Sequence, residues 1–125
     1  WQQRLLSEGR TAPPLENSFV SDALFAATPL AREIVRHLHS TFNIRFLSHV
    51  QKESLPPILE GRDLMCHAPT GTGKTLAYLL PVFHVLMQGY GAAAGAAPRP
   101  RPCQAFIFVP NPILAEQVYA VACRL

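Results

Sequence analysis

Apolar residues recur at helical spacing in the first third of the chain. Between residues 28 and 39, Leu30, Ile34 and Leu38 lie four apart, which is typical of a helix that buries one face. Thr28 precedes them and belongs to the residue types that cap helices. The pattern predicts a short amphipathic helix over residues 28–39.

A second helix is predicted to follow Ser48, whose hydroxyl can accept a hydrogen bond from the first helical turn. Val50 and Leu55 would face inward on this helix. Pro56 and Pro57 are expected to stop it, because proline has no backbone N–H and restricts the residue before it.

Two short apolar runs, at residues 63–66 and 104–109, lead into predicted helices at residues 73–88 and 112–125. Continuous apolar runs of this length are typical of parallel strands that are buried on both faces. The order of strand, loop and helix therefore predicts an α/β fold, with parallel strands flanked by helices.

Two stretches show neither a helical repeat nor a continuous apolar run. Residues 1–24 mix polar and apolar positions and predict an irregular N-terminal arm. Residues 89–102 consist largely of Gly, Ala, Pro and Arg, which predicts a flexible surface insertion. The arginines of this insertion are interpreted as part of a solvated linker, with contact to RNA or an acidic partner as the alternative. The folded domain is expected over residues 25–125.

Composition adds a few limits. With 125 residues, 49% of them hydrophobic, the chain can form a packed core. The net charge of +3 is mild, and the basic residues form no dense run that would mark a nucleic-acid face. The three cysteines lack C-x-x-C spacing, which favours a reducing, intracellular setting, whether nucleolar, mitochondrial or cytoplasmic. The longest apolar run, residues 76–87, is too short to span a membrane.

Residues 68–75 read A-P-T-G-T-G-K-T and differ from the phosphate-binding pattern G-x-x-x-x-G-K-[ST] only in an alanine at the first glycine position. Gly71 and Gly73 allow backbone N–H groups to turn toward an anion at the start of the next helix. The Lys74 ammonium can reach the outer phosphates, and the Thr75 hydroxyl can ligate Mg²⁺. The alternative is a Gly/Thr-rich turn without a ligand. The predicted triphosphate cradle comprises Ala68, Pro69, Thr70, Gly71, Thr72, Gly73, Lys74 and Thr75.

Several residues ahead of this loop have the same offsets as in one known family, namely Gln51, Pro57, Gly61 and Asp63. The chain from Phe25 to Leu125 resembles the first half of the N-terminal RecA-like domain of DEAD-box RNA helicases. Residues 68–75 are similar to that family's motif I, A-x-T-G-x-G-K-T. Residues 110–117, P-N-P-I-L-A-E-Q, are similar to its motif Ia, P-T-R-E-L-A-x-Q. The resemblance implies a partial RecA-like P-loop domain that uses ATP and Mg²⁺, with Lys74 in the catalytic role.

The resemblance also implies how the base is bound. Gln51 lies at the position of the family's adenine-reading glutamine, and a carboxamide matches the N6 donor and N7 acceptor of adenine but not the two acceptors of guanine. Gln51 would thus select ATP over GTP. Phe25 lies close to the position of an aromatic residue that stacks on the adenine in this family, and a core phenylalanine is the equal alternative.

Motif Ia departs from the family pattern, since Asn111, Pro112 and Ile113 replace its Thr, Arg and Glu. Proline brings neither a backbone N–H nor a charge. Because the segment contacts the RNA backbone in the family, Asn111 is left as a weak RNA-binding candidate with one hydrogen bond to donate.

Three functions remain open at this point. The resemblance implies the ATP-binding portion of an ATP-dependent RNA helicase that acts on RNA or ribonucleoprotein, although the acidic D-E-A-D motif and the second domain needed for hydrolysis are not among these residues. The alternative is a degenerate, inactive helicase-like scaffold with protein partners in a large ribonucleoprotein complex, for example in ribosome assembly. A different P-loop ATPase, such as a transporter or kinase subunit, would leave the position of Gln51 unexplained.

Overall fold

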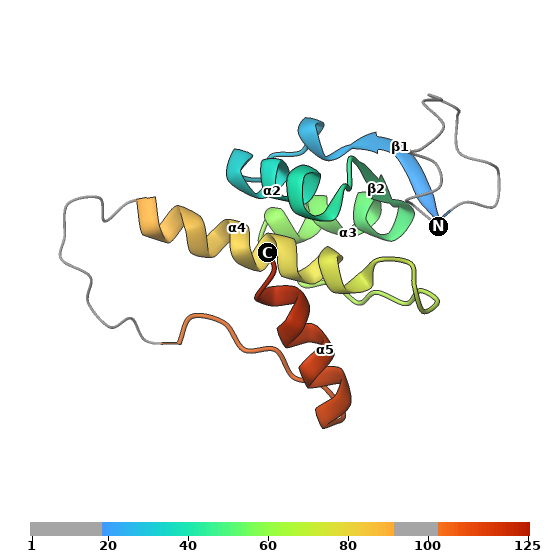
Figure 1. Ribbon diagram of the computed structural model, residues 1–125, viewed down its shortest axis with the longest axis vertical. Helices are drawn as coiled ribbons and strands as arrows, with labels where there is room; N and C mark the ends of the chain where they lie inside the picture. The colour runs from blue at the N-terminus through green and yellow to red at the C-terminus, as the bar shows by residue number, and fades with distance from the viewer. Residues whose placement is uncertain (1–18, 92–102) are drawn as a thin grey trace.

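The computed structural model describes residues 19–91 and 103–125. Most of the predicted arm at residues 1–24 and of the predicted insertion at residues 89–102 therefore lies outside the described residues. Figure 1 shows α4 running beneath α2 and α3, and α5 projecting away from them. The elements are β1 (Val20–Leu24), the 3₁₀ turn η1 (Phe25–Ala27), α2 (Arg32–Phe42), β2 (Phe46–Ser48), α3 (His49–Leu59), α4 (Lys74–Gly91) and α5 (Pro112–Ala122).

β1 and β2 form an antiparallel pair in which Val20 lies opposite Ser48 and Leu24 opposite Phe46. β1 falls within the stretch that was expected to be irregular. Its inward residue is Ser21, which is buried and donates its hydroxyl hydrogen bond to a β2 carbonyl over 2.9 Å. Because a serine occupies the inward position, the period-2 apolar signal of a strand is missing from the sequence.

The core forms between α2, α3, α4 and the sheet. Its members are Phe25, Leu30, Ile34, Leu38, Leu47, Leu55 and Leu80. The inward direction of the four-residue repeat before residue 39 is confirmed, but the helix begins at Arg32 and ends at Phe42. Thr28 is not its cap, since its hydroxyl donates to the Phe25 carbonyl over 2.7 Å. The N–H of Ala31 at the start of α2 instead donates to Nδ1 of His84 on α4, over 3.0 Å.

α3 begins where the sequence predicts and ends later than it predicts. Ser48 is the cap, as expected, but the helix continues through Pro56 and Pro57 to Leu59. Proline lacks an N–H donor yet keeps its carbonyl acceptor. The Pro56 and Pro57 carbonyls accept hydrogen bonds from the N–H groups of Glu60 and Arg62, each over 3.0 Å, so the last turn closes in spite of the two missing donors.

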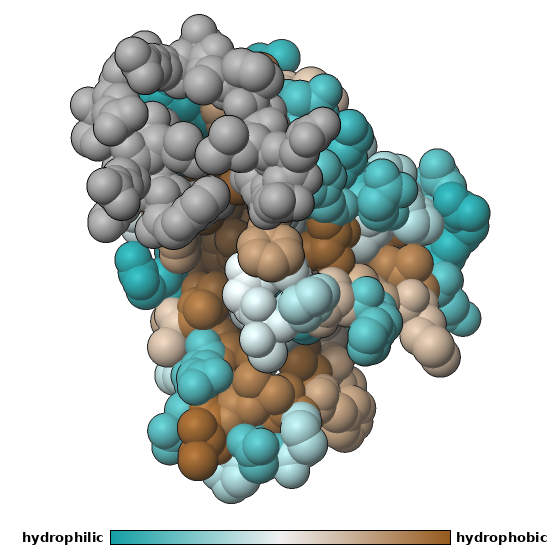
Figure 2. Space-filling view, turned by 90° about the vertical axis from the view of Figure 1, so that its right-hand side faces the viewer, coloured by the Kyte–Doolittle hydropathy of each residue, from teal (hydrophilic) through white to brown (hydrophobic). Residues whose placement is uncertain are grey.

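The described part of the chain has a mixed helix and strand fold, and its sheet is antiparallel with two strands. Residues 63–66 and 104–109, which were predicted to be parallel strands, have no regular secondary structure and no strand partner here. Their apolar side chains lie at the surface, with Met65 98% and Phe108 90% exposed. Figure 2 shows apolar atoms open to solvent on one face of the molecule.

Two further observations concern the surroundings of the chain. Among the helices in the described ranges, none has the length and apolar character needed to cross a lipid bilayer. The three cysteines, at positions 66, 103 and 123, are exposed and free, as expected for a chain without a disulfide framework.

Candidate functional site: the phosphate loop and its glutamine

The loop at residues 68–73 runs directly into α4, which starts at Lys74. Gly71 and Gly73 have φ angles of 80° and 94°, a backbone region that L-residues with side chains rarely adopt. The Thr72 hydroxyl closes the turn by donating to the Pro69 carbonyl over 2.9 Å. The backbone N–H groups of the first helical turn have no partner within the helix and face the N-terminal end, where the helix dipole favours an anion.

Lys74 is held inside the loop. Its ammonium donates to the carbonyl oxygens of Ala68 and Pro69, the second over 2.6 Å. An ammonium has three donors, so one remains for a further acceptor. A phosphate bound at the start of α4 would exchange neutral carbonyl acceptors for charged oxygens, which form stronger hydrogen bonds.

Gln51 lies against the phosphate loop, 4% exposed. Its side-chain carbonyl accepts from the Ser48 N–H over 2.8 Å, and its NH₂ group donates to the Gly73 carbonyl over 3.1 Å. The Gln51 N–H in turn donates to the Ser48 hydroxyl, which completes a capping box at the start of α3. One glutamine therefore fixes both the start of α3 and the last residue before α4.

A carboxamide retains capacity after these two bonds. Its oxygen has a second lone pair and its nitrogen a second N–H, which are the acceptor and donor that adenine N6 and N7 require. The position of Gly73 is equally constrained, because a Cβ atom there would lie 2.5 Å from the Gln51 nitrogen and 3.0 Å from the Ser48 hydroxyl. Glycine is needed at this position for both backbone conformation and space.

The two aromatic residues near the start of the described chain differ in exposure. Phe25 is 1% exposed and belongs to the core, which agrees with the second of its two interpretations. Phe19 is 55% exposed, and its carbonyl accepts from the N–H of His49, two residues before Gln51, over 3.0 Å. Sequence reasoning missed Phe19, because only the folded structure distinguishes an exposed phenylalanine from a buried one.

Asn111 caps α5, since its side-chain oxygen accepts from the Leu114 N–H over 2.9 Å. Pro112 occupies the first helical position, where the missing N–H does no harm. The motif Ia segment is thus organised around the start of a helix. In the described ranges, no hydrogen bond connects Asn111 to the phosphate loop.

The residues present fit a nucleotide better than they fit a metal ion alone. The glycine-shaped loop, the Lys74 ammonium and the start of α4 suit a polyphosphate. Thr75 would supply one hydroxyl for Mg²⁺, and no group of three or more His, Cys, Asp or Glu residues gathers in the described part of the chain. Such a magnesium ion would take its other ligands from phosphate and water.

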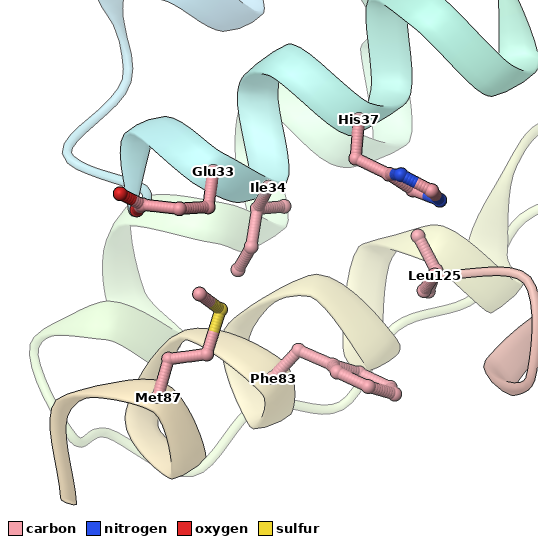
Figure 3. Close-up of a pocket in the computed structure, with 6 residues that line it drawn as sticks. All are labelled: Glu33, Ile34, His37, Phe83, Met87 and Leu125. Carbon is pink, nitrogen blue, oxygen red and sulfur yellow. The ribbon is translucent and has the colours of Figure 1, made fainter. Parts of the chain in front are cut away.

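A separate cavity of about 190 Å³ lies between α2 and α4, away from the loop. In Figure 3, Ile34 and His37 on α2 face Phe83 and Met87 on α4, and Leu125 closes one end. The lining is mostly apolar, and its two polar residues are not arranged to orient a ligand, because His37 already hydrogen-bonds to Arg124 and Thr41 and Glu33 points away. We assign this cavity no role in nucleotide binding.

A glycine-shaped loop that ends in a Lys-Thr pair and runs into a helix is typical of P-loop nucleotide-binding proteins. Comparison with known proteins narrows this class. Residues 48–125 match the family model described as DEAD/DEAH box helicase. Since the match covers more than half of the chain, the chain belongs to the DEAD/DEAH box helicase family.

Individual relatives agree with this family. The mouse protein "Probable ATP-dependent RNA helicase DDX28" is 48% identical over 73 residues, 58% of this chain and 13% of the relative. "ATP-dependent RNA helicase RhlB" of Pseudoalteromonas atlantica is 33% identical over 105 residues, 84% of this chain and 23% of the relative. "ATP-dependent RNA helicase DBP7" of Candida glabrata is 34% identical over 122 residues, 95% of this chain and 16% of the relative. The chain therefore spans less than a quarter of these relatives.

Proposed function

We propose that this chain is the ATP-binding portion of an ATP-dependent RNA helicase that acts on RNA or ribonucleoprotein. The contact between Gln51 and the Gly73 carbonyl is the main support, because it joins the residue suited to adenine to the loop suited to phosphates. A general phosphate-binding turn would not need a buried carboxamide behind it. Membership of the helicase family and the names of the relatives support the same function.

Each residue then has a defined task. The backbone N–H groups from Gly71 to Thr75 bind the phosphates, and the Lys74 ammonium neutralises the outer ones. Thr75 offers its hydroxyl to Mg²⁺, which withdraws charge from the phosphates when it is bound. Gln51 selects adenine through its remaining N–H and lone pair. Phe19, rather than Phe25, supplies the exposed ring that stacks on the base.

Residues 25–125 form part of a RecA-like domain in this proposal. Two exposed and mainly apolar segments, residues 63–66 and 104–109, each precede a helix. This is the arrangement of parallel strands whose neighbouring strands are supplied by another part of the protein. In the longer protein, further strands would pair with them and bury residues such as Met65 and Phe108. We place this protein in an intracellular compartment, as its free cysteines favour.

A second candidate is a helicase-like scaffold without unwinding activity, bound to protein partners in a ribonucleoprotein assembly. The structure of motif Ia favours it, because the Asn111 side chain is used as a helix cap and Pro112 has no N–H for a phosphate. RNA-stimulated ATP hydrolysis by the full-length protein separates the two candidates. A helicase hydrolyses ATP faster with RNA, whereas a scaffold binds ATP without this stimulation.

The phosphate assignment is tested by Lys74→Ala in the full-length protein. Binding of a fluorescent, non-hydrolysable ATP analogue should be lost, because the only ammonium in the loop is removed. Lys52→Ala is the matched control, since Lys52 is exposed and pairs with Asp22 on β1 over 3.0 Å. Equal affinity in the Lys74 variant and the control would rule out the assignment.

A further inference from the structure

The outward face of α2 carries basic side chains at helical spacing. Arg32, Arg36 and His39 occupy positions i, i+4 and i+7 of α2 and are all exposed, so they lie along one side of the helix. Arg45, just after α2, joins them, since its Nε donates to Nε2 of His39 over 2.7 Å. We call these four residues the α2 basic stripe. The stripe is not recognisable in the sequence, because its four residues are not contiguous.

Within residues 19–91 and 103–125, no acidic side chain forms an ion pair with this stripe. The ion pairs in the described ranges join Lys52 to Asp22 and Arg62 to Glu60, and neither includes a stripe residue. The one acidic residue of α2, Glu33, is exposed and forms no ion pair with the stripe. Figure 3 shows its side chain directed away from the other residues that line the cavity beside α4. The arginines of the stripe therefore form no ion pair within the described part of the chain.

The stripe is also not explained by the stability of α2. Arg32 is the first residue of the helix, where the positive end of the helix dipole makes a cation unfavourable. Arg32 and Arg36 are separated by about 6 Å along the helix axis. The charges of the stripe are those of its three arginines, because Nε2 of His39 accepts the hydrogen bond from Arg45. These charges are suited to a ligand with a repeating negative charge.

We propose that the α2 basic stripe binds the sugar–phosphate backbone of single-stranded RNA. Every exposed residue of α2 is polar or charged, whereas a protein partner would need an apolar centre for a stable interface. Backbone recognition of nucleic acid needs only cations and hydrogen-bond donors. This contact is independent of the nucleotide loop and sequence-nonspecific, and it adds to whatever RNA surface the rest of the protein provides.

The test measures the salt dependence of oligo(U) binding by the full-length protein without nucleotide, over about 50–200 mM KCl. Each phosphate contact to a single strand contributes about 0.7 to the slope of log K against log salt. Arg32→Gln with Arg36→Gln should therefore reduce the slope by about 1.4 and weaken binding roughly 25-fold at 0.1 M salt. Glutamine is a good helix former, so α2 should persist, which circular dichroism checks.

Single substitutions provide the matched control. Arg36→Gln should reduce the slope by about 0.7. Arg62→Gln removes the same charge from an arginine already paired with Glu60 over 2.8 Å, and it should leave the slope unchanged. Binding of the ATP analogue should be equal in all variants, so this test does not depend on the proposed nucleotide site.

Two results would overturn the proposal. One is an unchanged slope in the double variant with α2 intact. The other is direct binding of labelled poly-glutamate to the native protein more tightly than oligo(U) of equal charge, with this binding lost in the double variant, because that outcome would make the stripe a site for acidic protein segments. Loss of both slope and affinity for oligo(U) without such a preference for poly-glutamate supports the proposal.

Discussion

Replacing Gly73 by alanine tests the connection between the phosphate loop and Gln51. The new Cβ would lie 2.5 Å from the Gln51 nitrogen, 3.0 Å from the Ser48 hydroxyl and 3.3 Å from the Gln51 side-chain carbon. A contact of 2.5 Å forces the carboxamide to move. Movement breaks its hydrogen bonds to the Gly73 carbonyl and to the Ser48 N–H, and both groups lie where water has little access.

The magnitude follows from two contributions. A positive φ costs an alanine about 1–2 kcal/mol. Loss of the buried hydrogen bonds of Gln51 costs about 1–3 kcal/mol more. Gly71→Ala is the matched comparison, since Gly71 also has a positive φ but nothing lies within 4 Å of its added Cβ. The two alanine variants should therefore differ by about 1–3 kcal/mol, chiefly because of Gln51.

Hydrogen exchange of the Ser48 amide reports this difference in the full-length protein, because that amide donates to Gln51. Its protection should fall about tenfold or more in Gly73→Ala, since about 1.4 kcal/mol corresponds to a factor of ten. Protection should stay the same in Gly71→Ala. In a Gln51→Ala background, Gly73→Ala should have little further effect on Ser48. Native protection of Ser48 in Gly73→Ala would refute the reasoning.

Four further variants test individual side chains. Gln51→Ala should reduce the ratio of ATP to GTP affinity about tenfold, as two base hydrogen bonds of about 0.5–1.5 kcal/mol are lost, and an unchanged ratio in competition binding would contradict its role. Phe19→Ala should weaken the binding of adenosine nucleotides by about 1–3 kcal/mol, with little change in the melting temperature of the protein. Phe25→Ala should instead destabilise the fold by about 3–5 kcal/mol, and the reverse outcome would exchange the two roles. The hydrogen bond and charge of Lys52 lower the pKa of Asp22 below its ordinary 3.8. The stability from this pair is therefore present above pH 3.8 and is lost as the pH falls through the pKa of the folded state. In Lys52→Met, an NMR titration should find the pKa of Asp22 returned toward 3.8.

The sequence predicts the parts of this site that depend on local chemistry. Ser48 caps α3 because a hydroxyl at that position can reach an N–H three residues on, and the loop glycines fall where φ is positive. Other features depend on residues that are distant in the chain. β1 is recognisable only from its antiparallel pairing with β2. The end of α3 depends on which groups meet the proline carbonyls, a contact that no residue pattern encodes.

Burial is the other property that the sequence leaves open. Phe19 and Phe25 are the same residue type six positions apart, yet one packs in the core and one faces solvent. The offset to Gln51 alone favoured Phe25, whereas exposure favours Phe19 as the residue that contacts a base. The basic residues of α2 likewise look scattered until the helix places them on one side.

The two carbonyls that hold the Lys74 ammonium bear on the departure of a proposed phosphate ligand as well as on its arrival. If a phosphate bound there and left, the ammonium would return to the oxygens of Ala68 and Pro69 and would not be left without acceptors. Because hydrogen bonds would be exchanged rather than gained, their number would contribute little to affinity, and the negative charge of the ligand would contribute most. Such a loop would distinguish ligands chiefly by their charge and would hold a triphosphate more tightly than a less charged nucleotide.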